Sequence, residues 1–173
     1  MLLLTSVAWG CVGSQEREAA GAKQEPARPA RSSAQEPPPA EAVAEPPPKP
    51  EFVKAEAGDV AEVVRAQLSD ASDCEVLIYV GATWCEPCQR FHEAVEKGKL
   101  DDKLAGVRFV EFDHDVDKGR LVDAGYGGAM IPRFVVPNDD GTGSDQRIEG
   151  GVKGEAAVDN IMGRLEPLLG KRG

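Results

Sequence analysis

Two cysteines, Cys85 and Cys88, are separated by two residues in the run Trp84–Cys88, whose sequence is WCEPC. The apolar run Val76–Val80 ends shortly before this run and predicts a buried strand. A helix that begins at the first cysteine would accept Pro87 in its first turn, where a missing N–H has no consequence. The unpaired N–H groups of that turn would stabilise the thiolate of Cys85, the nucleophile of disulfide exchange. Cys88 would lie one turn further on and attack the mixed disulfide, so the spacing predicts a redox-active dithiol.

The same cysteine pair has two alternative interpretations, a structural disulfide and one half of a zinc site. A zinc site with four ligands would need two more thiolates or imidazoles. The folded region adds only Cys74, His92 and His114, and the chain has no second C-x-x-C pair. We therefore favour redox chemistry and expect neither a metal nor a cofactor.

A second motif lies 44 positions after Cys88, where the sequence has Ile131-Pro132. The segment Gly81–Cys88 resembles the active site of the thioredoxin superfamily, in which an Ile-Pro pair with a cis bond faces the dithiol and two short strands follow. Phe134–Val136 and Arg147–Gly150 supply such strands here. The resemblance spans roughly residues 55–170 and implies an α/β thioredoxin-like fold, a central mixed β-sheet flanked by helices.

The resemblance also implies roles for individual residues. Cys85 and Cys88 are the implied catalytic pair, and Trp84, Ile131 and Pro132 are the implied substrate-binding residues. An Ile before the Pro is the thioredoxin-like choice and favours the reducing direction. The implied partners are protein disulfide substrates and a membrane reductant that recharges the dithiol.

The chain departs from the thioredoxin pattern at the buried acid that moves the proton of the resolving thiol. Thioredoxin has an Asp six residues before its first active-site Cys, and Tyr79 stands there in this chain. The Lys that pairs with that Asp falls at Asp113 when positions are counted without gaps from Pro132. Glu86 and Asp113 are therefore the candidate proton acceptors. The alternative is that both are solvated surface acids.

Three further residues near the motifs have open roles. Arg133 either raises the thiolate fraction of Cys85 or points to solvent. Cys74 is expected to be a small buried hydrophobe, with a third redox thiol as the alternative. Met130 keeps open a binding or copper-delivery module without turnover, because soft sulfur ligands suit Cu(I).

The motif and the spacing point to different subfamilies. WCEPC matches some extracytoplasmic reductases of cytochrome c maturation, which carry an inserted strand and helix after the active-site helix. Only 18 residues, Gln89–Gly106, separate Cys88 from the next expected strand. This spacing is more similar to plain thioredoxin or to the thioredoxin-like domain of transmembrane reductant conductors.

The N-terminus resembles the end of a bacterial lipoprotein signal, in which small residues precede a Cys that becomes lipidated. Ala8 and Gly10 fit this pattern before Cys11, whereas Trp9 is bulky for its place and no basic residue comes earlier. We expect a signal peptide over 1–10, a lipid on Cys11, and a location in the bacterial cell envelope facing the periplasm. The alternative is an ordinary apolar N-terminus with a chance Cys.

The amino-acid composition divides residues 11–173 into two regions. Nine of the 13 prolines lie between Pro26 and Pro50, in a stretch with almost no bulky apolar residue. We expect a disordered Pro-rich tether over 11–50 and a thioredoxin-like domain over 51–173. The chain carries a net charge of −10 and has no basic stripe, which argues against nucleic acid as a partner. The domain is expected to be a monomer.

Periodicity predicts the elements of the domain. They are a short strand at Phe52–Val53, a helix from Asp59 as N-cap to Leu68, a strand at Glu75–Val80, the active-site helix from Glu86 to about Gly98, a strand at Val107–Phe112, a short helix at Lys118–Ala124, and a last helix from about Gly154 to Leu169.

Overall fold

A computed structural model describes residues 47–170 of the chain. The predicted signal peptide, Cys11 and the tether as far as residue 46 lie outside the described residues. The elements in chain order are β1 Glu51–Lys54, α1 Val60–Asp70, β2 Glu75–Gly81, α2 Glu86–Glu96, β3 Val107–Asp113, α3 His114–Asp123, β4 Arg133–Pro137, β5 Gly143–Glu149 and α4 Ala157–Leu169.

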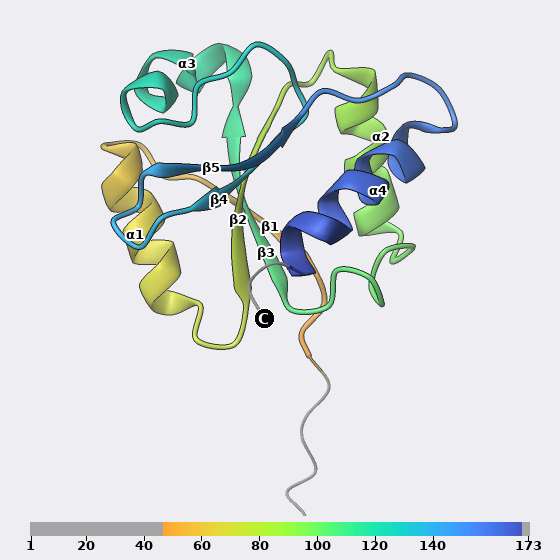
Figure 1. Cartoon of the computed structure of the whole chain (residues 1–173), viewed down its shortest axis with the longest axis horizontal. Helices are drawn as coiled ribbons and strands as arrows, with labels where there is room; N and C mark the ends of the chain where they lie inside the picture. Colours follow the sequence, from red (N-terminus) through yellow and green to blue (C-terminus); the bar gives the residue numbers. More distant parts are fainter. Residues whose placement is uncertain (1–46, 171–173) are drawn as a thin grey trace, which may run out of the picture. The chain divides into compact units, whose positions relative to one another are not determined.

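The strands form one mixed sheet in the order β1-β3-β2-β4-β5. β1, β3 and β2 run parallel, whereas β4 is antiparallel to both β2 and β5. Figure 1 shows α1 and α3 on one side of this sheet and α2 and α4 on the other. The predicted thioredoxin-like fold with a central mixed sheet between helices is confirmed.

Each face of the sheet has its own apolar core, because successive side chains of a strand point to opposite faces. On β2, Leu77 and Tyr79 belong to the core under α2 and α4, together with both active-site cysteines. Val76, Ile78 and Val80 belong to the core under α1 and α3. β2 is therefore buried on both faces, as its continuous apolar run predicts.

The helix starts follow from local capping. Asp59 caps α1 as predicted, since its carboxylate accepts the N–H of Glu62 at 3.0 Å. The predicted start of α3 at Lys118 is wrong, because α3 begins at His114. Asp113 accepts the N–H groups of Asp115 and Val116 at 2.8 and 3.0 Å and so caps α3 at the end of β3.

The described chain enters the domain at the end of the sheet away from the dithiol. The carbonyl of Pro48 accepts the N–H of Gly106 at 2.6 Å, just before β3, and Lys49 pairs with Asp101 at 2.7 Å. β1 then runs parallel to β3 and β2, whose carboxyl end leads into the active site. Within residues 47–170, none of the helices has the length and apolar character needed to cross a bilayer.

Candidate active site

The dithiol lies at the start of α2, where the sequence predicted it. Cys85 is the N-cap, and Pro87 is in the first turn. The two sulfurs form a disulfide with an S–S distance of 2.09 Å. The N–H of Cys88 points at the Sγ of Cys85 at 3.3 Å, so a backbone donor of the first turn faces the predicted nucleophile.

Exposure separates the two sulfurs very little in this disulfide form. Cys85 is 4% exposed and Cys88 is 2% exposed. The asymmetry of the pair therefore comes from position in the helix. The sulfur of Cys85 receives the N–H of the first turn, which favours a thiolate there by direct hydrogen bonding and by the helix dipole.

The Ile131–Pro132 bond is cis, as the resemblance implied. Arg133 lies opposite Val80 in the antiparallel register, which places the preceding Pro132 beside Gly81 at the edge of the sheet where the dithiol lies. Ile131 packs against the apolar core that contains both cysteines. The loop and the dithiol therefore meet at one end of the molecule.

Trp84 offers an apolar surface beside the dithiol. Its side chain is 63% exposed, while its Nε1–H donates to Asp115 at 2.7 Å and its ring meets the edge of His114. Sequence reasoning missed the contribution of Asp115, because the start of α3 was placed too late. The indole is thus held at its polar end, and most of its surface stays exposed.

Arg133 matches neither of its two sequence interpretations. Its side chain is buried and points to the face opposite the dithiol, where its guanidinium donates to the carbonyls of Tyr126 and Met130 at 2.9 and 3.2 Å. Glu149 pairs with it at 3.6 Å. Burial lowers the pKa of Arg133, and the nearby Glu149 opposes this.

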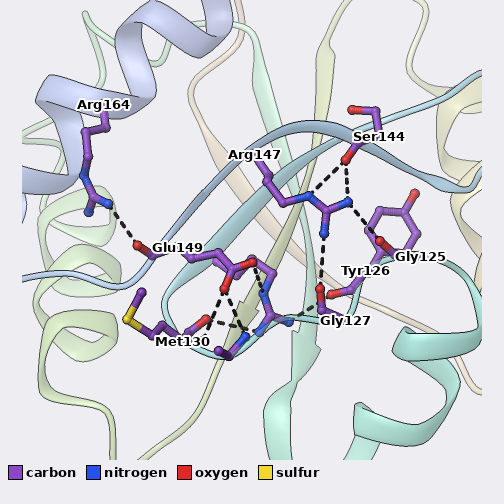
Figure 2. A network of polar contacts seen from close by, with 10 residues as sticks. Gly125, Tyr126, Gly127, Met130, Ser144, Arg147, Glu149 and Arg164 are labelled. Atoms are coloured by element: carbon purple, nitrogen blue, oxygen red, sulfur yellow. Dashed lines mark hydrogen bonds and ion pairs between the residues drawn. The ribbon is translucent and has the colours of Figure 1, made fainter.

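Glu149 also holds the loop that precedes the cis Ile131–Pro132 bond. Its carboxylate accepts the N–H groups of Ala129 and Met130 at 3.1 and 3.2 Å. Figure 2 shows Arg147 reaching the carbonyls of Gly125 and Gly127, and these bonds measure 3.0 and 3.1 Å. The segment 125–131 is therefore fixed by buried or half-buried polar side chains from β4 and β5.

Glu86 is engaged on the outer side of α2. Its carboxylate bonds Arg90 and accepts the N–H of Gly154 at 3.1 Å. The hydrogen bond of Arg90 and then that of Gly154 lower the pKa of Glu86. A carboxylate held ionised by such partners is a poor proton acceptor near neutral pH.

Asp113 lies where β3 ends and α3 begins. Asp113 does line the cavity next to Cys88, but its carboxylate caps α3. The residue opposite Tyr79 in the parallel register is Glu111, not Asp113.

Glu111 makes a polar contact with a histidine that the sequence did not predict. Its Oε1 lies 2.8 Å from Nε2 of His92, which is one turn after Cys88 on α2. Both side chains line a cavity of about 570 Å³ that Cys88 also borders. The ring of Tyr79 lies along β2 against Gly81, where any side chain would collide with the tyrosine hydroxyl.

Two sulfur-containing residues outside the dithiol, Cys74 and Met130, were also candidates. Cys74 is a free thiol just before β2, and it is half-buried rather than fully buried. Met130 is 58% exposed and its sulfur lies against Gly150. Within residues 47–170, no group of His, Cys, Asp or Glu side chains is arranged to hold a metal ion.

Comparison with known proteins gave similarity at the level of structure. No protein-family model and no curated protein sequence matches the chain. A thioredoxin of Trichomonas vaginalis is 26% identical, covering 67% of this chain and 96% of its own, with a TM-score of 0.45. A mutant thioredoxin from Halobacterium salinarum is 24% identical, covering 68% of this chain and 90% of its own, with a TM-score of 0.40.

The fold and the site define the class. The strand order, the disulfide at the start of α2 and the cis Ile131–Pro132 bond at the same edge make this a thioredoxin-like domain. The Cys85–Cys88 pair in that setting supports a thioredoxin-superfamily protein, and in general terms a thiol–disulfide oxidoreductase.

Proposed function

We propose that this protein is a membrane-tethered thiol–disulfide oxidoreductase of the bacterial cell envelope that reduces protein disulfides. The observation that carries the proposal is the position of Cys85. It caps α2, receives the N–H of Cys88 at 3.3 Å, and lies at the edge of the sheet where the cis Ile131–Pro132 bond lies. A thiolate in that position is the expected nucleophile of disulfide exchange.

The proposed reaction has two steps. The Cys85 thiolate attacks one sulfur of a substrate disulfide, forms a mixed disulfide, and releases the other substrate sulfur as a thiolate that takes a proton from water. Cys88 then loses its proton, attacks the sulfur of Cys85 and releases the second substrate thiolate. The substrate gains two electrons and becomes two thiols, while the enzyme becomes the disulfide seen here.

Substrate binding is assigned to the surface around the dithiol. Trp84 is exposed and directly precedes Cys85, and Ile131 packs against the core cluster that contains both cysteines. An extended peptide could bind on this surface through apolar contacts with the indole. The polar network under the loop would keep its backbone in place during repeated binding.

The envelope location rests on the sequence pattern that ends at Cys11 and on the Pro-rich segment after it. A lipid on Cys11 would hold the domain at a membrane, and disulfides persist in extracytoplasmic compartments. Mass spectrometry of the membrane fraction of the native host tests this. A diacylglyceryl mass on the N-terminal peptide is expected, and a soluble protein that retains Met1 would contradict the lipoprotein assignment.

Insulin reduction with dithiothreitol as the electron source tests the activity. The wild-type chain should accelerate precipitation of the insulin B chain, and Cys85→Ser should abolish that acceleration. A protein that binds disulfide peptides without turnover would instead be a binding or copper-delivery module. That outcome would contradict the proposed enzyme.

A further inference from the structure

The second step of the proposed reaction needs a proton acceptor for Cys88. This side chain is 2% exposed, so bulk water reaches its sulfur poorly. Burial also disfavours its thiolate. The two carboxylates predicted from sequence are both engaged, Glu86 with Arg90 and Gly154, and Asp113 at the start of α3.

A cavity behind the dithiol connects Cys88 to a different acid. It measures about 570 Å³, far more than one water needs, and its lining includes Cys88, His92 and Glu111. In the parallel register Glu111 lies opposite Tyr79, whose side chain belongs to the core under α2 and α4. Glu111 therefore faces the same side of the sheet as the dithiol.

The pair formed by His92 and Glu111 is held in place by its surroundings. Nε2 of His92 lies 2.8 Å from the carboxylate, and each side chain is 25% exposed. The imidazole stacks on Phe52 with 3.7 Å between ring centroids, and Tyr79 meets it edge-on. This packing from β1 and β2 fixes the ring, so Nε2 is aimed at Glu111.

We propose that Glu111 accepts the proton of Cys88 through water in this cavity, and that His92 is the positioning residue that holds the Glu111 carboxylate. The inference rests on the proposed dithiol function. As Cys88 attacks Cys85, its proton passes through water to the second carboxylate oxygen of Glu111, and the substrate sulfur leaves with the electron pair of the broken S–S bond. Glu111 returns the proton to solvent afterwards.

The other charged and titratable residues that line the cavity are Lys54, Tyr79, Asp113, Asp117 and Arg120. Asp117 accepts the N–H of Asp113 and pairs with Arg120, which also donates to backbone carbonyls before α1. Lys54 is an exposed cation on β1. Burial, reinforced by Glu111, raises the pKa of Tyr79, so its hydroxyl stays protonated.

The experiment measures the second step alone as a function of pH. The full chain in its dithiol form is mixed with a peptide disulfide, and release of the second peptide thiol is followed in a single turnover. Glu111→Gln should slow this release about 100-fold at neutral pH and leave formation of the mixed disulfide unchanged. The rate should recover at alkaline pH, where hydroxide replaces the missing base.

Two further variants fix the interpretation. Glu111→Asp keeps a carboxylate and should restore most of the neutral rate, whereas the exposed Glu93→Gln on α2 should behave as the wild type. If Glu111→Gln folds poorly, His92→Leu provides the test, because loss of the Nε2–H donor should move the pH profile of release upward.

Three results would overturn the proposal. The first is that Glu111→Gln releases the second thiol with the pH profile of the wild type. The second is that Glu111→Asp loses as much of the neutral rate as Glu111→Gln does. The third is that the pH profile shifts in Asp113→Asn and in no other variant. A wild-type protein that forms no mixed disulfide at all would instead contradict the dithiol function itself. The two failures are therefore distinguishable.

Discussion

At the scale of single residues, the reactivity of the dithiol depends on what surrounds the sulfur of Cys85. The N–H of Cys88 at 3.3 Å and the start of α2 favour its thiolate, whereas the neighbouring Glu86 carries a negative charge that disfavours it. That charge is drawn toward Arg90 and the N–H of Gly154 on the outer side of the helix. The helix start should therefore dominate.

The pKa of reduced Cys85 should lie below the value of about 8.5 for a free thiol, because the N–H of Cys88 and the start of α2 favour its thiolate. Ultraviolet absorbance of the thiolate, followed against pH, measures it directly. The transition should disappear in Cys85→Ser and persist in Cys88→Ser. Persistence in Cys85→Ser would assign the acidic thiol to Cys88 instead.

Glu86 predicts a pH dependence of stability. Because Arg90 and then Gly154 lower its pKa in the folded state, its contribution is complete above the ordinary Glu pKa of about 4.3 and is lost as the pH falls through the lowered value. Glu86→Gln should therefore lower Tm at pH 7, and the difference from wild type should vanish near pH 2. A Tm difference that stayed constant with pH would show that the charge has no role.

At the scale of elements, α2 and the cis-Pro loop are supported differently. α2 begins at its N-cap Cys85, shortly after the buried strand β2. This start was predictable from the run Trp84–Cys88. The loop is held by Arg133, which directly follows it, and by long-range contacts of Glu149 on β5. No local pattern around Arg133 could have shown that its charge is buried away from the dithiol.

Removal of Glu149 should destabilise the domain. Glu149→Ala leaves the buried Arg133 without its ion pair and two loop N–H groups without an acceptor, at a cost of about 2–4 kcal/mol in the free energy of unfolding. Urea denaturation measures this. The exposed Asp145→Ala on the same strand should change it by less than about 0.5 kcal/mol. Equal effects of Glu149→Ala and Asp145→Ala would contradict the role of Glu149 in holding Arg133 and the loop.

The difference between local patterns and long-range contacts explains which parts of the fold could be predicted. Strand and helix types followed from periodicity, and Asp59 was recognisable as a cap. The register of β2 against β3 was not, because parallel pairing is a long-range property that local patterns do not encode. Glu111 and His92 therefore went unnoticed as a pair, although each was visible in the sequence.

At the scale of the whole molecule, the entry of the chain and the dithiol lie at opposite ends of the parallel strands. Pro48 and Lys49 anchor the entry near the start of β3, whereas Cys85 follows the carboxyl end of β2. The described chain therefore reaches the sheet at the end that lies away from the reactive sulfurs.

A chain that starts at residue 47 should fold and reduce insulin at the rate of the full-length protein, since the described core lies within 47–170. Limited proteolysis of the full chain should cut first within 12–46. Cleavage within 55–170 at a comparable rate would contradict the predicted domain boundary.

The central claim is that Cys85 attacks the substrate and Cys88 resolves the intermediate. Trapping with a disulfide-containing protein substrate tests it most directly. Cys88→Ser should accumulate a covalent complex that mass spectrometry maps to Cys85 and that dithiothreitol releases, whereas Cys85→Ser should trap nothing. A complex mapped to Cys88 would contradict the assignment of the nucleophile, and absence of any complex in both variants would contradict the oxidoreductase itself.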